Sequence, residues 1–143
     1  MTVTITIPKK EEIFARSIPV NVASEGETWS RTQLGDYALK SGVYVHSFNK
    51  KILYVGMTSG ETGDTYGIFG ERLRREFQSK ASQNSDLYNL LASQNGPIDV
   101  CMFDRSEIDA LITNDESKFS PKAHTCIFEQ ALIAAFTPPG NKL

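Results

Sequence analysis

A pair of short β-type segments around a polar turn constrains the fold of this chain more than any other stretch. β-branched and aromatic residues dominate positions 43–48 and 52–56, and Asn49-Lys50-Lys51 separates them. Two such runs on either side of a tight polar turn predict an antiparallel β-hairpin. The rest of the chain must then pack on one of the two faces of this hairpin.

The two faces of the hairpin are predicted to differ in chemistry, because successive side chains of a strand point to opposite sides. One face is aliphatic and is expected to pack against the core, with Val43, Val45, Leu53 and Val55. The other face is polar and aromatic, with Tyr44, His46, Tyr54 and Gly56. Because the helices are expected to cover the aliphatic face, the polar aromatic face is left over as the candidate site.

Apolar periodicity and capping residues predict the other elements. A strand that alternates threonine with aliphatic residues is expected at 2–7, a short strand around 18–22, and a helix from the N-cap Ser30 to about residue 40. After the hairpin, helices are expected at 68–80 and 86–93, a strand at 98–103, a short helix at 106–112 and a long helix at 121–136. This order predicts the α+β class.

The predicted architecture is a three-stranded antiparallel central sheet, made of the hairpin and the strand at 98–103 and flanked by helices. Residues 1–40 are expected to form an N-terminal strand and helix extension, packed on a single domain that spans 41–143. The first strand either lengthens the sheet or pairs with another copy of the chain. The extension as a whole either covers a sheet edge or forms an oligomer surface.

The helix at 68–80 carries three arginines close to the hairpin. Its predicted apolar stripe consists of Phe69, Leu73 and Phe77. On a helical wheel Arg72 and Glu76 fall at the margin of that stripe, whereas Arg74 and Arg75 lie further toward solvent. Arg72 and Glu76 either form an i, i+4 ion pair worth a few tenths of a kcal/mol or serve a site.

The long helix places a carboxylate beside its own apolar stripe. The residues predicted to be buried are Phe128, Ala131, Leu132 and Ala135. Glu129 lies at the edge of this stripe, where a carboxylate needs a cation of the protein or a metal ion as its partner. The Thr-Pro-Pro-Gly run at 137–140 ends the helix and is expected to let Asn141 fold back.

Taken together, these residues form an ordered series. It begins with the tripeptides Gly42-Val43-Tyr44 and Tyr54-Val55-Gly56 and continues with Arg72, Glu129, Leu132-Ile133, Pro138 and Asn141. From about residue 41 to the C-terminus, the series resembles the GIY-YIG nuclease superfamily. The resemblance implies a GIY-YIG-type sandwich and a metal-dependent endonuclease that hydrolyses phosphodiester bonds in DNA.

The resemblance also implies roles for the individual side chains. Glu129 would bind Mg²⁺ or Mn²⁺, which prefer carboxylate and water oxygens, and Arg72 would hold phosphate oxygens with its planar fork of donors. Tyr44 would act as general base if a nearby cation favoured its phenolate, and Tyr54 would orient the water or the phosphate. Asn141 completes the catalytic set, with Gly42 and Gly56 as supporting residues.

One position departs from the family pattern. Several family members carry a histidine four residues after the arginine, where this chain has Glu76. A carboxylate there could bind a second cation or could repel phosphate. His46 either substitutes as a proton carrier or is an ordinary strand histidine, and His124 is interpreted as structural.

The charge of the chain limits any nucleic-acid surface to a small region. The net charge is −2, but residues 41–80 contain six basic and four acidic side chains, against four and eight in residues 81–143. Lys50, Lys51, Arg74 and Arg75 are therefore predicted to contact DNA. Binding is expected to be modest and sensitive to salt, since affinity comes mostly from phosphate neutralisation.

Neither the termini nor the cysteines indicate another class of protein. No apolar run approaches the roughly 20 residues of a membrane span, and the start of the chain has no signal-peptide pattern, so a soluble, cytoplasmic protein without a membrane partner is expected. Cys101 and Cys126 have no metal-ligand or redox spacing and are interpreted as reduced thiols.

Two functions of different class are consistent with these patterns. The first is the metal-dependent DNA endonuclease. The second is a catalytically inactive module of the same fold that binds nucleic acid or a protein partner, for which the acidic balance and Glu76 are the reasons. Since 143 residues leave no room for a separate DNA-binding domain, target choice would rest on loops, on the N-terminal segment, on a protein partner or on a second copy.

Overall fold

The hairpin is formed by β3 (Gly42–Phe48) and β4 (Lys51–Met57), as predicted. Asn49 and Lys50, with φ of 50° and 62°, both adopt the left-handed conformation. Two consecutive left-handed residues make a type I′ turn, whose twist matches that of the two strands. The turn is therefore one residue shorter than the sequence indicated.

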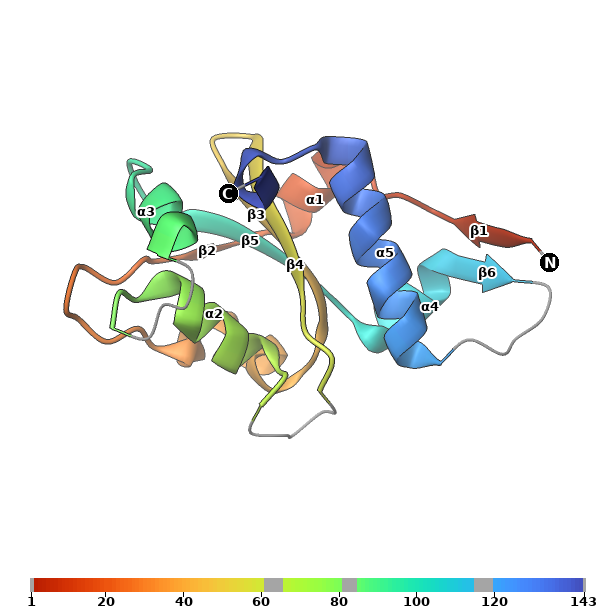
Figure 1. Cartoon of the computed structure of the whole chain (residues 1–143), viewed down its shortest axis with the longest axis horizontal. Helices are drawn as coiled ribbons and strands as arrows, with labels where there is room; N and C mark the ends of the chain where they lie inside the picture. The colour runs from red at the N-terminus through yellow and green to blue at the C-terminus, as the bar shows by residue number, and fades with distance from the viewer. Residues whose placement is uncertain (1, 61–65, 81–84, 115–119, 143) are drawn as a thin grey trace.

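Figure 1 shows the computed structural model, which describes residues 2–60, 66–80, 85–114 and 120–142. The α+β class is confirmed, and the sheets are antiparallel. None of the described helices is long and apolar enough to cross a membrane.

The central sheet has four strands in the order β2-β5-β3-β4, so the prediction of three strands is wrong. The hairpin and β5 (Ile98–Asp104) are adjacent as expected. The additional strand is β2 (Ile18–Val20), which pairs with β5 in the register Ile18↔Val100. Residues before position 41 thus supply part of the central sheet, because β2 satisfies backbone groups that β5 would otherwise present at an open edge.

The first strand does not lengthen the central sheet. β1 (Val3–Ile5) instead pairs with β6 (Ile112–Asn114) in a separate two-stranded sheet. Figure 1 shows this sheet at one end of the molecule, beyond α4 (Arg105–Leu111). Residue 112, predicted as the end of a helix, starts β6, because α4 ends one residue earlier.

Helices cover both faces of the central sheet. One face packs against α2 (Phe69–Phe77), α3 (Ser85–Ala92) and the 3-10 segment η1 (Arg31–Leu39), which Gly35 interrupts. The other face packs against α1 (Lys10–Arg16), α4 and α5 (Pro121–Phe136). The chain then ends in η2 (Pro139–Lys142) beside β4.

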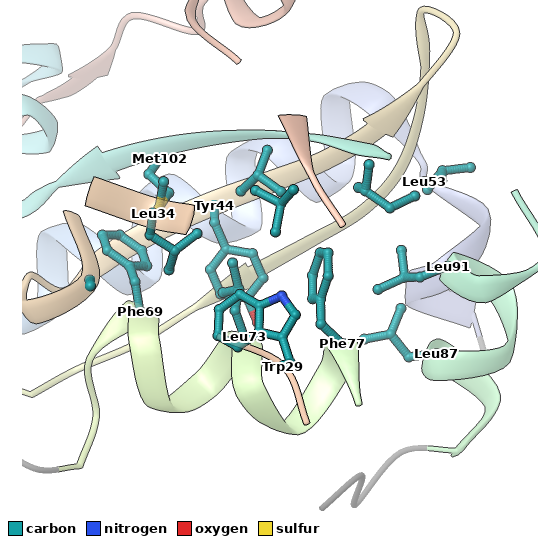
Figure 2. Packing of buried hydrophobic residues seen from close by; sticks show 14 residues of the cluster. Trp29, Leu34, Tyr44, Leu53, Phe69, Leu73, Phe77, Leu87, Leu91 and Met102 are labelled. Atoms are coloured by element: carbon teal, nitrogen blue, oxygen red, sulfur yellow. The ribbon is translucent and has the colours of Figure 1, made fainter. Parts of the chain in front are cut away.

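The packing of α2, α3 and η1 on the first face contradicts the prediction that the polar aromatic face is open. Trp29, Leu34, Phe69, Leu73 and Phe77 are buried in the same cluster as Tyr44. Figure 2 shows Tyr44, Leu73 and Phe77 gathered between the sheet and α2. The apolar stripe of α2 must be buried somewhere, and this face of the sheet is where it packs.

A β-bulge changes the predicted division of the hairpin residues. His46 pairs with Tyr54 but Ser47 pairs with Ile52, which leaves Leu53 as an extra residue in β4. Leu53 consequently packs in the cluster of Tyr44, while Val55 packs in the opposite cluster. Strict alternation, which placed Leu53 with Val55, fails at this point.

The long helix buries fewer residues than predicted. Phe128 and Leu132 are buried, whereas Ala131 is half-buried and Ala135 is exposed. The helix starts as expected, with the Ser120 hydroxyl accepting a hydrogen bond from the backbone N–H of Ala123. Its exposed C-terminal turn leads into η2, which brings Asn141 to the outer edge of β4.

Candidate functional site

Tyr44 lies wholly inside the molecule, with none of its surface exposed. Its ring lies across β4 at Gly56, its cross-strand partner. A Cβ atom at position 56 would overlap the phenol oxygen of Tyr44. Gly56 therefore makes room for the tyrosine ring.

Glu76 lies next to that phenol in the interior. The Tyr44 hydroxyl donates a hydrogen bond to Glu76 Oε2, and His46 Nε2 lies 2.8 Å from Glu76 Oε1. His46 is fully buried and Glu76 is 5% exposed. We call Tyr44, His46 and Glu76 the buried polar cluster.

The position of Glu76 rules out its predicted partner. Arg72 forms no side-chain hydrogen bond or ion pair among the residues that the structure describes, so the i, i+4 pair with Glu76 is absent there. Glu76 instead belongs to the buried face of α2. Its spacing of seven from Phe69 and three from Leu73 is a helical core spacing, which is the signal that could have predicted its burial.

His46 is held by rings on several sides. Its ring centroid lies 4.9 Å from that of Tyr44, 5.1 Å from Phe77 and 5.9 Å from Tyr54. Nδ1 has no hydrogen-bond partner in the described part of the chain. This geometry fits the tautomer with hydrogen on Nε2, which donates to Glu76 and leaves only a lone pair without a partner.

Tyr54 is the accessible phenol of the pair. It is only half-buried, and its ring centroid lies 6.2 Å from that of Tyr44. Burial, the Glu76 carboxylate and the Glu129 carboxylate raise the pKa of Tyr54 to about 12, against the opposing effect of Arg72. Three charged groups, two from α2 and one from α5, therefore act on this one hydroxyl.

Burial also raises the pKa of Tyr44 well above its ordinary value. The negative charge of Glu76 adds to this effect, and Arg72 opposes it only in part. Both causes favour the protonated phenol. The expectation of a Tyr44 phenolate therefore has no support in this arrangement, and a shallow, wet cleft does not surround this residue.

Arg72 is the exposed arginine of α2, which reverses the predicted pattern. Arg74 and Arg75 are half-buried and both bind Glu71, at 2.8 Å and 3.4 Å. Their guanidinium groups are thus partly neutralised within the helix. Arg72 remains available to an external anion on the side of α2 that acts on Tyr54.

Glu129 is half-buried on α5 and accepts a hydrogen bond of 2.9 Å from Gln130 Nε2. Among the described residues, no three His, Cys, Asp or Glu side chains gather into a metal-binding group. A single carboxylate fits Mg²⁺ only where water and substrate phosphate complete the coordination. At such a site the phosphate of a bound phosphodiester would supply the remaining oxygen ligands of the ion.

Asn141 uses both ends of its amide to hold β4. Its Oδ1 accepts from the Val55 N–H at 2.9 Å, and its Nδ2 donates to the Val55 carbonyl at 2.8 Å. The Asn141 amide therefore satisfies the outer backbone groups of Val55, as a residue of a neighbouring strand would. Because these bonds anchor the amide to Val55, Asn141 positions the neighbouring Tyr54.

The remaining predicted site residues lie at the margins. A Cβ at Gly42 would overlap the Phe103 carbonyl, so this glycine permits close pairing of β3 with β5. Lys50 and Lys51 are exposed at the hairpin turn. His124 Nδ1 bonds Asp109 at 2.8 Å. Between β4 and α2 the sequence, rich in Gly, Thr and acidic residues, also predicts a loop that borders the site; residues 61–65 of it lie outside the described residues.

No protein-family model, curated protein or solved structure matches this chain.

Proposed function

We propose that this chain is a metal-dependent endonuclease that hydrolyses phosphodiester bonds in DNA, with a site of the GIY-YIG type. The observation that carries the proposal is the setting of the Tyr54 hydroxyl. Arg72 and the buried Glu76 of α2 and Glu129 of α5 all act on its pKa, although Glu129 lies far from the other two in the sequence. A cation that can bind phosphate and a carboxylate that can bind a metal are thus both near enough to this half-buried phenol to shift its pKa.

The accessible groups would contact the substrate. Arg72 would hold two oxygens of the scissile phosphate with its planar fork, and Tyr54 would orient the attacking water. Glu129 would hold Mg²⁺ or Mn²⁺, an ion that neutralises charge developing on the phosphate. Lys50 and Lys51 would contact the DNA backbone beyond the site.

The buried polar cluster would receive the proton that the water loses. As the water oxygen bonds to phosphorus, the P–O bond to the leaving nucleoside oxygen would break, and that oxygen would take a proton from solvent. The proton of the attacking water would pass to the Tyr54 oxygen, the Tyr54 proton to Tyr44, and the Tyr44 proton to Glu76 Oε2. No tyrosine needs to become a phenolate, which the raised pKa values of Tyr44 and Tyr54 disfavour. This role of Glu76 differs from those that the sequence suggested, which were an ion pair with Arg72, binding of a second cation or repulsion of phosphate.

Cleavage of plasmid and linear duplex DNA with Mg²⁺, Mn²⁺ or chelator tests the proposal. Wild-type protein should cut only with a metal ion. Arg72→Ala removes a preorganised donor at the phosphate, a change that costs on the order of a hundredfold in rate. Glu129→Gln keeps the volume and removes the charge that holds the ion, and should abolish most cleavage.

Two exposed positions away from the site provide matched controls. Lys122→Ala removes a cation and Glu27→Gln removes a carboxylate, both from exposed side chains, and neither should change the rate. Full activity of Glu129→Gln would place the metal elsewhere. Wild-type protein that cuts no DNA with either metal ion would contradict the nuclease.

The buried position of Tyr44 favours a second candidate, an inactive module that binds nucleic acid or a protein. Such a module would bind DNA without cutting it, and its binding would weaken with salt. Each lost phosphate contact lowers the log-log salt slope by about 0.9 on duplex DNA. A Lys50→Ala, Lys51→Ala variant with the slope of the wild type would remove the hairpin turn from the binding surface.

A further inference from the structure

The outer edge of β1 is an exposed strand edge of unusual composition. Thr6 donates its backbone N–H to the Leu111 carbonyl at 2.8 Å, in the same register as the pairs Thr4↔Thr113 and Ile5↔Ile112. Hydrogen-bonded and non-hydrogen-bonded pairs alternate along an antiparallel ladder. Thr4 therefore bonds to β6, and the backbone groups of Val3 and Ile5 point away from it.

No described residue pairs with those backbone groups of Val3 and Ile5. Their side chains pack against the cluster that contains Phe128, so the apolar face of β1 is covered and only its edge is open. The side chain of Thr4 is exposed on the other face. The sheet lies at one end of the molecule (Figure 1).

The composition of this edge favours pairing and does not prevent it. Natural edge strands are usually protected by lysine, proline, a bulge or an inward-pointing charge. Residues 2–7 contain no charged residue and no proline, and Pro8 follows directly. The edge is therefore chemically suited to pairing with a further strand.

We propose that this further strand is β1 of a second copy, antiparallel about a two-fold axis at Thr4. In that register Val3 faces Ile5 of the other copy, and these pairs exchange the backbone hydrogen bonds that each chain leaves open. Thr4 faces Thr4 of the second copy in the non-hydrogen-bonded pair, a favourable cross-strand combination. The neutral strand brings no like charges together, so one strand satisfies both sides of an isologous contact.

The proposal does not depend on nuclease activity. It predicts a four-stranded sheet across the dimer, in the order β6-β1-β1-β6. Thr4 and Thr113 are cross-strand partners and are both exposed, which makes them matched positions. In the dimer, however, the two Thr4 Cα atoms would be about 4.5 Å apart. The two Thr113 residues would be three strand spacings apart, roughly 14 Å.

Disulfide trapping tests this register. In a full-length Cys126→Ser background, Thr4→Cys should form an intermolecular disulfide under mild oxidation, because its geometry falls within the disulfide range. Thr113→Cys should not, since its distance is too large. Equal crosslinking of the two variants, or crosslinking of Thr113→Cys alone, would overturn the proposed pairing.

Sedimentation equilibrium tests the dimer without any crosslink. The wild type should show a monomer–dimer equilibrium, and Thr4→Lys should weaken it about tenfold or more by placing like charges opposite each other. Thr113→Lys adds the same charge one strand away and should leave dimerisation unchanged. Circular dichroism confirms that both variants fold. A monomeric wild type, or equal weakening by both lysines, would refute the proposal.

Discussion

The two faces of the central sheet are built from alternate residues of the same strands, yet their chemistry differs. Val43 and Val45 point into a cluster of buried apolar residues with Phe103 and Phe128. The residues next to them, Tyr44 and His46, point into a cluster that also contains the buried carboxylate of Glu76. One face is stabilised mainly by apolar packing, and the other also depends on hydrogen bonds to a buried carboxylate.

Because only one face of the sheet contains a buried carboxylate among the described residues, only that face carries a cost in folding stability from burying a charged group. A buried carboxylate loses its hydration, and the hydrogen bonds of Tyr44 and His46 return only part of that loss. The apolar face has no comparable cost. Buried polar groups that cost stability are candidates for a functional role. The buried polar cluster is such a group, and its Tyr44 and His46 rings contact the half-buried Tyr54.

The largest expected effect is on the apolar face. Phe128→Ala deletes a fully buried ring that packs against Phe103 at 5.3 Å between centroids, and should lower the free energy of unfolding by about 3–5 kcal/mol. Urea denaturation measures this loss. Cleavage by the protein that remains folded should be unchanged, and a specific loss of cleavage would show that the two faces are not independent.

The next effect is on the polar face. Glu76→Leu removes the acceptor of two buried donors and should cost about 2–3 kcal/mol of stability. Adding Tyr44→Phe removes one of those stranded donors and should recover part of the loss, so the two changes should be non-additive. Strict additivity in urea denaturation would contradict the hydrogen bond on which the buried polar cluster depends.

A smaller effect on stability is expected at β4, the edge strand of the central sheet, whose residues contribute to both faces. Asn141→Ala removes two hydrogen bonds to Val55 and should destabilise the protein by about 1–2 kcal/mol. Lys142→Ala, an exposed neighbour, serves as the control. If Asn141 only positions Tyr54, cleavage should fall but remain metal-dependent. An unchanged melting temperature together with complete loss of cleavage would assign Asn141 a direct role in the chemistry.

The smallest effect concerns pH. The pKa of Tyr54 rises from 10.0 to about 12 on folding, so the folded chain keeps a proton that the unfolded chain loses. The stability linked to this group is fully present below about pH 10 and is lost as pH rises through about 12. Tyr54→Phe should make the unfolding free energy less dependent on pH in that window. Unaltered dependence would show that Tyr54 ionises alike in both states.

Several features of the fold could be predicted because they are local. The alternation of Val43 to Phe48 and the turn at Asn49 predict the hairpin, and the Ser120-Pro121 start predicts α5. The fold-back of Asn141 follows from the Pro-Pro-Gly run that ends that helix. In each case the deciding residues are neighbours in the chain, so capping, turn geometry and periodicity are sufficient.

The sequence could predict some neighbours of the candidate site but not their setting. The pattern selected Tyr54, Arg72 and Glu129, and in the structure the charges of Arg72 and Glu129 both act on the pKa of Tyr54. It did not predict that Tyr44 is sealed under α2 or that Arg72 is the exposed arginine. Both depend on how α2 is rotated and which sheet face it covers, which are set by packing against residues far away in the sequence.

By itself, the sequence determined the class of the fold, the hairpin and the order of most helices and strands, since these depend on local propensity and apolar period. Only the tertiary structure decided that β2 joins the central sheet, that a bulge moves Leu53 to the face of Tyr44, and that Glu76 is buried beside His46. The physical reason is that strand partners and helix faces are chosen by burial of area and pairing of backbone groups over the whole chain.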